Sequence, residues 1–379
     1  MARKVYDMAI WGATPAGLAA AITLAKARHS VLLLNTPAPS AMECPLCDWC
    51  PAALFDLDGI DKGLIKTTKA APFRSVQFHS SRLDHTADHS SRRPLGYLLP
   101  AGALTKQLSK LATKAGVTKR NSAEQLEFEL GEDRVHLLTA GKTYSARFLL
   151  AAQGHPNEIL GALGRTSQAS CPPQTMSAVA LDVPLSPKQK EFLKKSLKGD
   201  LHIFELDERS ELGVAFLLGA TLHIRVISTS MASGLRTTEL GALLNRLQLH
   251  KILPETLKLD RAKAAAWSPP AGMALEQETH DAKRTLLVGS AGGFADSVTG
   301  QTIYPTIASA LIAAQVSMEA ITAATPQDTL AEFHSTWREA LVDYLRPPNT
   351  SIGMLLPLLF ANDRIVGRFT EAIVQGEDL

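Results

Sequence analysis

The sequence predicts an α/β protein in which a parallel sheet carries an inserted antiparallel sheet and is followed by C-terminal helices. A strand, a glycine-containing turn, a helix and a second strand follow one another in residues 5–34. A second glycine-rich turn joins a strand to a long alanine-rich helix in residues 285–323. Between these units, residues 178–228 contain four short runs with alternating apolar residues, which is typical of an antiparallel sheet.

Size and composition are those of an ordinary globular protein of about two domains. The chain has 379 residues, of which 45% are hydrophobic and 20% are charged, and this length allows a large buried core. A formal net charge of +2 and scattered basic residues give no electrostatic basis for nucleic-acid binding. We recognise no secretion signal, no disulfide framework and no membrane-spanning run, so we expect a cytoplasmic protein.

The first glycine turn has the pattern of a nucleotide-binding βαβ unit. Val5–Trp11 is predicted to be a buried strand, Leu18–Ala27 a helix and Val31–Leu34 a second strand. The turn before the helix would direct exposed N–H groups and the helix dipole toward a pyrophosphate. Gly12 permits the tight turn, and Gly17 lets the helix pack close to the strand.

Two positions depart from the G-x-G-x-x-G pattern and its acidic partner. Thr14 replaces the middle glycine, where a side chain would crowd a pyrophosphate. Asn35 follows the second strand, where its amide can hydrogen-bond a ribose hydroxyl without the charge of a carboxylate. Taken alone, this segment is either a nucleotide site or an α/β unit that binds no nucleotide. Its candidate cofactor-binding residues are Gly12, Thr14, Pro15, Ala16, Gly17 and Asn35.

The second glycine-rich segment lies between a predicted strand, Thr285–Val288, and a predicted helix, Thr306–Ala323. It reads GSAGGFADSVTGQTIYP from Gly289 onward, and its glycines permit close backbone approach to a ligand. The segment resembles the G-D-A-A-G…D-P-x-x-G-x-G-I motif of FAD-dependent oxidoreductases, in particular geranylgeranyl reductases and p-hydroxybenzoate-hydroxylase-type monooxygenases. With the N-terminal turn, the resemblance covers most of the chain. It implies a glutathione-reductase-like FAD-binding Rossmann domain with an inserted antiparallel-sheet substrate domain.

The resemblance implies FAD as the cofactor and assigns further contacts to it. In that family the strand-end Gly-Asp holds the ribitol, a position taken here by Gly289 and Ser290. The Gly-x-Gly backbone at the start of the next helix contacts the flavin, a position taken by Gly300, Gln301 and Thr302. Helix N-terminal amides at this point stabilise negative charge on a reduced flavin.

Three further positions depart from the family pattern. Ser290 keeps a hydroxyl but lacks the carboxylate of the usual Asp. Gln153 takes the Asp position of the family's Ala-Asp-Gly strand end. The arginine that usually contacts FAD, near the start of the helix after Tyr97, is replaced by Pro100 or Ala101.

Three of the four cysteines lie within seven residues, at Cys44, Cys47 and Cys50, and the fourth is Cys171. Their spacing allows iron–sulfur ligation or, less typically, a four-cysteine zinc site. In the third interpretation they are plain thiols beside the flavin, with Cys44 at the family's cysteine position near the isoalloxazine ring. Two prolines in this segment predict a rigid loop. We assign no metal, and these four cysteines are the only candidate ligands.

The middle and the tail of the chain complete the prediction. The expected antiparallel strands are Ala178–Val183, Leu201–Leu206, Gly213–Leu218 and Thr221–Ser228, and the resemblance implies that their sheet covers the flavin and shapes the substrate site. The tail should form two helices, Gln327–Leu345 and Ser351–Gln375. The second begins very apolar, and we expect it to be buried against the FAD domain; the alternatives are a cover over the substrate pocket and contact with a membrane surface. His79, His85 and His89 are expected to be solvated.

These elements predict three parts of the chain. The FAD-binding domain comprises residues 1–70, 97–164 and 275–325, the substrate domain residues 71–96 and 165–274, and the C-terminal helical segment residues 326–379.

The resemblance predicts an FAD-dependent reductase or dehydrogenase acting on an apolar small molecule, with NAD(P)H or a protein as electron donor. A flavin monooxygenase is the first alternative, and the changes at Gln153 and Ala101 count against it. The second alternative is a non-catalytic, flavoprotein-like ligand-binding protein. As a catalytic hypothesis, Cys44 or Cys47 near the flavin is the proton donor or a redox partner.

Overall fold

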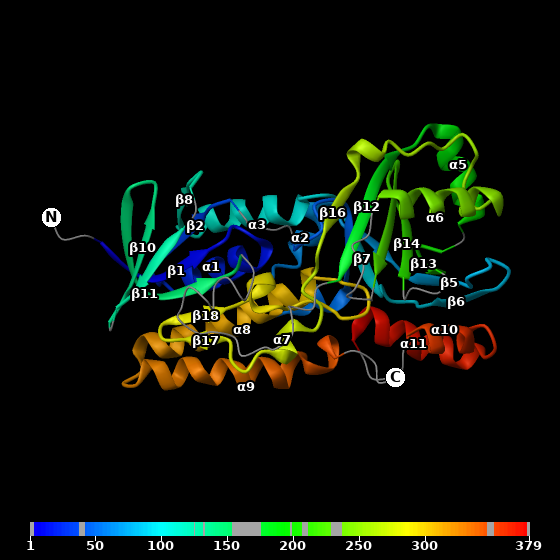
Figure 1. The fold of residues 1–379 in the computed structure, drawn as a ribbon. Helices are drawn as coiled ribbons and strands as arrows, with labels where there is room; N and C mark the ends of the chain where they lie inside the picture. Colours follow the sequence, from blue (N-terminus) through cyan, green and yellow to red (C-terminus); the bar gives the residue numbers. More distant parts are fainter. Residues whose placement is uncertain are drawn as a thin grey trace.

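The computed structural model describes residues 4–37, 42–124, 126–131, 133–153, 176–197, 199–206, 211–228, 237–346 and 352–376. Figure 1 shows an elongated molecule with a parallel sheet toward one end and a mainly antiparallel sheet toward the other. Two long helices, α8 (Ile303–Thr322) and α9 (Pro326–Leu345), run along one side of the parallel sheet. Among the helices described, none combines the length and the hydropathy that crossing a membrane requires.

The parallel sheet confirms the predicted α/β core. Its strand order is β17-β18-β11-β1-β2-β8, and β9 and β10 extend it from the first half of β11. Ile10 of β1 pairs with Leu33 of β2 and Leu150 of β11, all in parallel register. The strands are β1 (Val5–Trp11), β2 (Val31–Asn35), β8 (Thr118–Asn121), β9 (Glu127–Leu130), β10 (Val135–Thr139), β11 (Lys142–Ala151), β17 (Asp281–Ala282) and β18 (Thr285–Leu287).

Three helices cover one face of this sheet: α1 (Pro15–Lys26), α3 (Ala103–Lys114) and α8. Helix α1 is rich in alanine and packs against both α3 and α8, and α9 packs on α8. The predicted packing face of α9 is confirmed, because Phe333, Trp337 and the other apolar residues of that face are buried.

Helices α1 and α8 each begin three residues earlier than the sequence pattern indicates, at Pro15 and Ile303 rather than at Leu18 and Thr306. The reason is the same in both. A proline in the first turn lacks only an N–H group that has no partner within the helix, so Pro15 and Pro305 belong to the helices rather than preceding them.

The second sheet confirms the predicted strands of the middle region. Its order is β16-β12-β15-β14-β13-β5-β6, and every pair is antiparallel except β13 with β5. Helices α5 (Pro187–Ser196) and α6 (Thr237–Leu249) cover one face. The strands are β5 (Ser75–His79), β6 (Thr86–Ser90), β12 (Ser177–Pro184), β13 (Leu201–Leu206), β14 (Glu211–Leu218), β15 (Thr221–Ser228) and β16 (Ala265–Trp267).

A three-stranded sheet of order β3-β7-β4 lies between the two larger sheets. Strand β3 (Asp48–Pro51) corrects the expectation that the whole cysteine segment is a loop, because it pairs with β7 (Gly96–Leu99). The third strand is β4 (Ala71–Phe73). The remaining short elements are η1 (Ala52–Asp56), α2 (Gly63–Thr68), η2 (Arg261–Lys263), α7 (Met273–Glu276) and η3 (Gly289–Gly292).

The C-terminal segment differs from the prediction in two ways. It forms two helices, α10 (Ile352–Leu359) and α11 (Asp363–Gln375), because Asn362 starts α11 by accepting a hydrogen bond from the N–H of Arg364. These helices pack on the mainly antiparallel sheet rather than on the parallel sheet, through residues such as Phe369 against Phe78. His79 is also buried rather than solvated, in contact with His202.

Candidate cofactor-binding site

The two predicted glycine turns touch each other. Gly289 has a φ of +61°, and a Cβ built on it would lie 2.9 Å from the Cβ of Ala16 in the first turn of α1. Its N–H donates to the Ser309 hydroxyl on α8 at 3.1 Å. Any side chain at Gly289 would therefore push the two turns apart.

The N-terminal turn has the backbone that the motif requires. Gly12 has a φ of +111°, and a Cβ on Gly17 would lie 2.1 Å from the carbonyl oxygen of Gly12. The Thr14 hydroxyl accepts a hydrogen bond from the N–H of Gly17 at 3.2 Å and donates one to the carbonyl of Ala152 at 3.1 Å. The hydroxyl that replaces the middle glycine is thus turned toward the protein.

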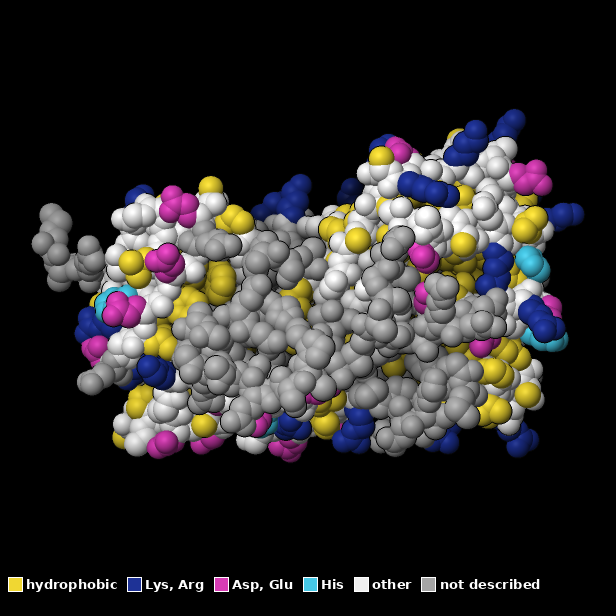
Figure 2. Space-filling model, in the orientation of Figure 1, with side chains coloured by type: hydrophobic (Ala, Val, Ile, Leu, Met, Phe, Trp, Pro, Cys, Tyr) yellow, Lys and Arg dark blue, Asp and Glu magenta, His cyan; other side chains and the backbone are white. Residues whose placement is uncertain are grey.

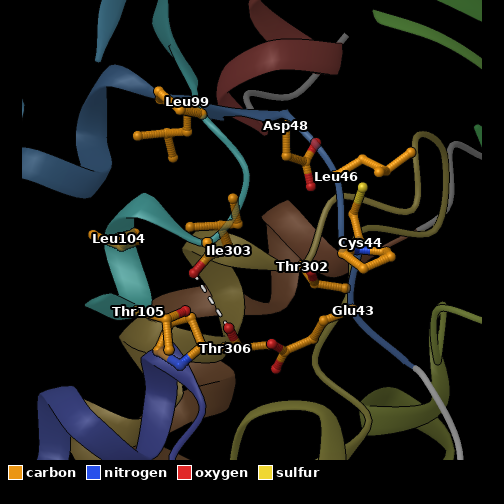
Figure 3. Close-up of a pocket in the computed structure, with 14 residues that line it drawn as sticks. Glu43, Cys44, Leu46, Asp48, Leu99, Leu104, Thr105, Thr302, Ile303 and Thr306 are labelled. Carbon is orange, nitrogen blue, oxygen red and sulfur yellow. Dashed lines mark hydrogen bonds between the residues drawn. The ribbon is translucent and has the colours of Figure 1, made fainter. Parts of the chain in front are cut away.

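The N-termini of three helices converge on one cavity of about 180 Å³ (Figure 3). Pro15 is the first residue of α1, Gly102 precedes α3, and Thr302 precedes α8; all three line the cavity. None of these helices has an acidic residue in its first turn, and neither Gly102 nor Thr302 caps its helix with a side chain. The N-terminal ends of the helix dipoles therefore make this space favourable for negative charge.

The turn before α8 is held by buried polar side chains. Gly300 has a φ of +63°, and its N–H donates to the carbonyl of Asp296 at 3.1 Å. The Gln301 amide oxygen accepts from the N–H of Tyr304 at 3.2 Å, and its NH₂ donates to the carbonyl of Trp49 on β3. Gln301 thus connects α8 to β3 and is fully buried, so its side chain has a structural role that the sequence did not reveal.

Glu43 places a carboxyl group in the same cavity (Figure 3). It shares a hydrogen bond with the Ser290 side chain, while its Oε1 is buried without a partner among the described residues. Burial raises the pKa of Glu43 to about 7, against the effect of the Ser290 hydrogen bond and with a contribution from the Asp48 charge. Glu43 is not among the site residues predicted from the sequence, although it is the only acid in residues 42–47.

The predicted ribose-binding position, Asn35, is exposed at the end of β2. Beside it, Trp11 Nε1 donates to the Thr36 hydroxyl at 2.8 Å, and the Gln153 amide donates to the Thr36 carbonyl at 2.8 Å. A Cβ on Gly12 would lie 2.6 Å from the Cβ of Gln153. Gln153 therefore packs against the turn and connects the ends of β2 and β11 through an NH₂ donor, which an ionised Asp lacks.

The three described cysteines do not point to a common centre. Cys50 lies in the core beneath the parallel sheet, Cys47 in the core of the second sheet, and Cys44 against a small apolar cluster that includes Trp267. Among the described residues no group of three or more His, Cys, Asp or Glu side chains is arranged to hold a metal ion. The four-cysteine interpretation also requires Cys171, which lies outside the described residues, so it stays a prediction.

Burial keeps these thiols protonated. It raises the pKa of both Cys44 and Cys47 to about 12, with the Asp182 hydrogen bond adding to the effect at Cys47. Burial likewise raises the pKa of Cys50. Cys44 lines the cavity and Cys47 does not. The environment of these residues therefore disfavours the thiolate form at neutral pH.

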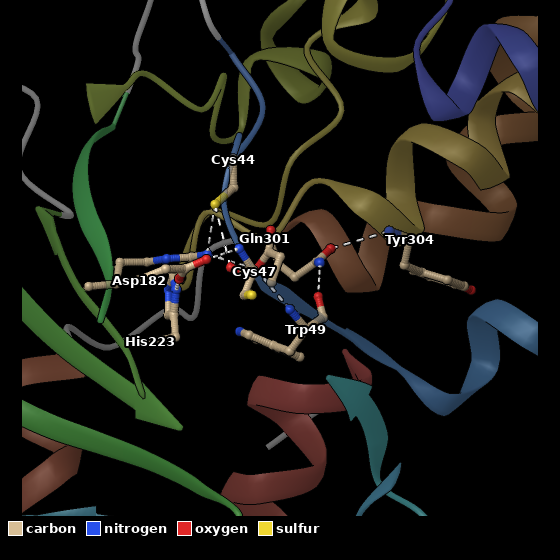
Figure 4. Close-up of polar contacts among 9 residues, drawn as sticks. Cys44, Cys47, Trp49, Asp182, His223, Gln301 and Tyr304 are labelled. Carbon is tan, nitrogen blue, oxygen red and sulfur yellow. Dashed lines mark hydrogen bonds and ion pairs between the residues drawn. The ribbon is translucent and has the colours of Figure 1, made fainter. Parts of the chain in front are cut away.

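A buried polar cluster lies beside Cys44 (Figure 4). Arg225 on β15 donates to Asp48 at 2.8 Å and to the Cys44 sulfur at 3.1 Å, and its guanidinium stacks over the Trp267 ring at 4.8 Å. Only 1% of Arg225 is exposed, so the pairing with Asp48 is what makes its burial tolerable.

Asp182 extends the same cluster. One of its carboxylate oxygens pairs with His223 Nδ1 at 2.7 Å, and the other accepts from the N–H of Cys47 at 3.0 Å. Burial lowers the pKa of His223, whereas Asp182 opposes that shift. The cluster links the cysteine loop to strands β12 and β15 of the second sheet.

Comparisons with known proteins were made at the level of sequence and of structure. No family model and no curated protein matches the sequence. A geranylgeranyl bacteriochlorophyll reductase-like protein from Thermoplasma acidophilum has a similar structure, with a TM-score of 0.71 and 17% identity over 99% of this chain and 98% of that chain. The p-nitrophenol 4-monooxygenase of Pseudomonas putida gives a TM-score of 0.66 and 15% identity over 99% and 95%. CtdE, solved in complex with FAD, gives 0.60 and 12% over 99% and 96%.

The chain has the fold of these flavoproteins. In this flavoprotein fold, the candidate residues of both glycine turns lie around the contact between α1 and α8. Asn35 ends β2 beside the first turn, because the N–H of Gly12 donates to the carbonyl of Leu34 at 2.8 Å. The structural likeness confirms the predicted fold class. The roles of the individual residues and the domain boundaries stay predictions.

Proposed function

We propose that this chain binds FAD and is a flavin-dependent reductase or dehydrogenase acting on an apolar small molecule. The observation that carries the proposal is the convergence of three helix N-termini on one cavity beside two glycine turns in contact. Such an arrangement stabilises a diphosphate without any lysine or arginine.

The residues present fit FAD in the following roles. The turn from Gly12 to Gly17 would hold the diphosphate, because its glycines leave room for close approach and α1 adds its dipole. Gly289 and Ser290 would hold the ribitol. Asn35, exposed at the end of β2, would hydrogen-bond a ribose hydroxyl. The start of α8, with Gly300 and Thr302, would stabilise negative charge on the flavin.

When bound, FAD supplies the redox chemistry by accepting and donating a hydride equivalent. The chain's own residues orient the partners and exclude water. Leu46, Leu99 and Leu104 give the cavity an apolar wall. The fixed dipoles of α1, α3 and α8 favour negative charge without reorganisation, because helix ends are rigid.

The apolar cluster beside Cys44 supports an apolar substrate. Met176, Ile227 and Trp267 are buried there and pack against Cys44 and Leu46. The thiol of Cys44 stays protonated at neutral pH and accepts a hydrogen bond from Arg225. Cys44 is the better placed of the two proposed catalytic cysteines, because it lines the cavity and Cys47 does not.

The first test is the visible absorption spectrum of the purified protein, recorded without oxygen and again in air. Two flavin bands, bleached by NAD(P)H or by a reduced protein donor, are the expected result. Oxygen consumption that depends on both reductant and substrate would identify a monooxygenase instead. Absence of flavin bands, with no change in thermal stability on adding FAD, would reject the proposal.

A second candidate, a non-catalytic ligand-binding protein, is favoured by two observations. Glu43 brings a carboxyl group into a space suited to anions, and the side chain of Gln153 packs against Gly12. This candidate predicts that an uncharged apolar ligand, and not FAD, raises the melting temperature.

We also propose peripheral contact with an anionic membrane surface through α10 and α11. A cavity of about 490 Å³ lies between them, lined by Leu355, Leu358, Phe369 and two arginines, Arg364 and Arg368. Leu358 is 51% exposed. Figure 2 shows hydrophobic side chains with Lys and Arg at the end of the molecule that carries these helices. Apolar and basic groups in this arrangement suit a surface of anionic lipids.

A further inference from the structure

We propose, on the basis of the FAD site proposed above, that FAD binding to this chain is coupled to the uptake of one proton by Glu43. The side chain enters the cavity on which α1, α3 and α8 converge. One of its oxygens is engaged with Ser290, at the position assigned to the ribitol, and Oε1 is buried without a partner among the described residues. A buried oxygen in that state is expected either to be protonated or to gain a partner when the cavity fills.

Among the described residues, the one cation found beside the cavity is Arg225, which is already engaged with Asp48 and the Cys44 sulfur. The described residues that line the cavity include no Lys, Arg or His. Of the other titratable groups, Asp48 is already paired with Arg225, and Cys44 is a neutral thiol. The first turns of α1, α3 and α8 contribute no acidic side chain. The helix ends are therefore the main source of positive potential facing Glu43.

An ionised Glu43 would draw on the same converging helix ends as bound FAD, whose diphosphate is assigned to the start of α1. Like charges that close to one another disfavour ionisation of the group that can still bind a proton. Glu43 is that group, because its pKa of about 7 is near neutrality, whereas the diphosphate of FAD loses no proton between pH 6 and pH 9. Protonated Glu43 keeps one oxygen to accept from Ser290 and gains an O–H donor for a phosphate or ribitol oxygen.

Proton uptake by Glu43 should make the Kd for FAD depend on pH. Above pH 7 each further pH unit lowers the protonated fraction of Glu43 about tenfold, so the Kd for FAD should rise about tenfold per unit, and below pH 7 it should level off. Glu43→Gln presents a permanent NH₂ donor and no charge. Its Kd should stay near the low-pH value of the natural protein throughout.

The experiment is calorimetric titration of the full chain with FAD from pH 6 to pH 9, in two buffers of different ionisation enthalpy. The natural protein and a control with an exposed acid removed, Glu339→Gln, should take up about one proton per FAD at pH 8. Glu43→Gln should take up none. Binding of FAD by Glu43→Gln at every pH shows that this variant is folded. Glu43→Asp, which keeps a titrating group, should retain the pH dependence.

A Kd for the natural protein that is constant from pH 6 to pH 9, with no proton uptake, would overturn the coupling and leave the FAD site intact. Equal pH dependence in Glu43→Gln and the natural protein would assign the proton to another group and would also overturn it. If neither protein binds FAD at any pH, the coupling and the FAD site both fail.

Discussion

Gly289 of the second glycine turn lies so close to Ala16 of the first that a Cβ on it would be 2.9 Å from the Ala16 Cβ. This contact joins the start of α1 to the end of β18. It therefore brings together the two glycine-rich segments, which are far apart in the sequence. Gly289→Ala should destabilise the protein by about 2–5 kcal/mol, because it adds overpacking to the strain of a positive φ.

Gly141→Ala is the matched control for this prediction. Gly141 has a φ of +66°, close to the +61° of Gly289, but nothing lies within 4 Å of its added Cβ. The free energy of unfolding of Gly141→Ala should fall only by the strain of the positive φ, about 1–2 kcal/mol. Urea denaturation measures both variants, and equal losses would show that the contact with Ala16 is not tight.

The buried pair Arg225–Asp48 should be strongly coupled. Arg225→Met leaves the Asp48 carboxylate without its cation and should destabilise the fold by about 3–5 kcal/mol. Asp48→Asn keeps an oxygen for the N–H of Trp49, to which Asp48 Oδ1 lies at 2.9 Å. Because the double variant has neither charge, its loss of stability should be smaller than the sum of the losses of the two single variants. Additive losses in a double-mutant cycle would contradict an energetically linked pair.

Acid should destabilise the protein through its buried histidines. Burial lowers the pKa of His79 to about 3 and that of His202 to about 4, so both stay neutral in the fold while the unfolded chain binds protons below about pH 6.5. Stability is therefore present at pH 7 and is lost as the pH falls, by about 2 kcal/mol per histidine at pH 5. His79→Gln should flatten this decline, whereas exposed His250→Gln should not. A decline that is unchanged in His79→Gln would contradict the buried neutral state.

The cysteines should resist alkylation in the folded protein. A pKa of about 12 for Cys44 and Cys47 lowers the thiolate fraction about a thousandfold relative to an ordinary thiol. In a Cys171→Ser background, iodoacetamide at pH 8 should label the native protein only after denaturant is added. Rapid native labelling of Cys44, located by mass spectrometry, would restore a reactive-thiolate role.

The sequence predicted the fold well where the signals are local. The bounds of β1, β13 and β15 match the predicted strands, because alternation and turn residues are short-range properties. The starts of α1 and α8 lie three residues before the predicted ones, because the first helical turn accommodates Pro15 and Pro305. Strand β3 was missed since its partner, β7, is far away in the sequence, as the pair Cys50–Tyr97 shows.

The site could be predicted only in part. Glycine-rich turns can be recognised from composition, and the two turns lie together as expected. The polar contacts around them cannot be recognised in this way, because Arg225 and Asp48 are 177 positions apart in the sequence and Gln301 and Trp49 are 252 apart. No local pattern indicates that Glu43 enters the cavity, or that the three neighbouring cysteines face three different apolar clusters.

The most direct test of the central claim is the Kd of FAD for the natural protein and for Thr302→Asp and Thr302→Asn, measured by quenching of flavin fluorescence. Both side chains are good helix N-caps, so both variants should fold. The Asp variant adds a negative charge where the helix ends converge. We predict that the natural protein and Thr302→Asn bind FAD with similar Kd values and that Thr302→Asp binds about tenfold or more weakly. No binding by the natural protein, or equal binding by all three, would contradict an FAD site at this cavity.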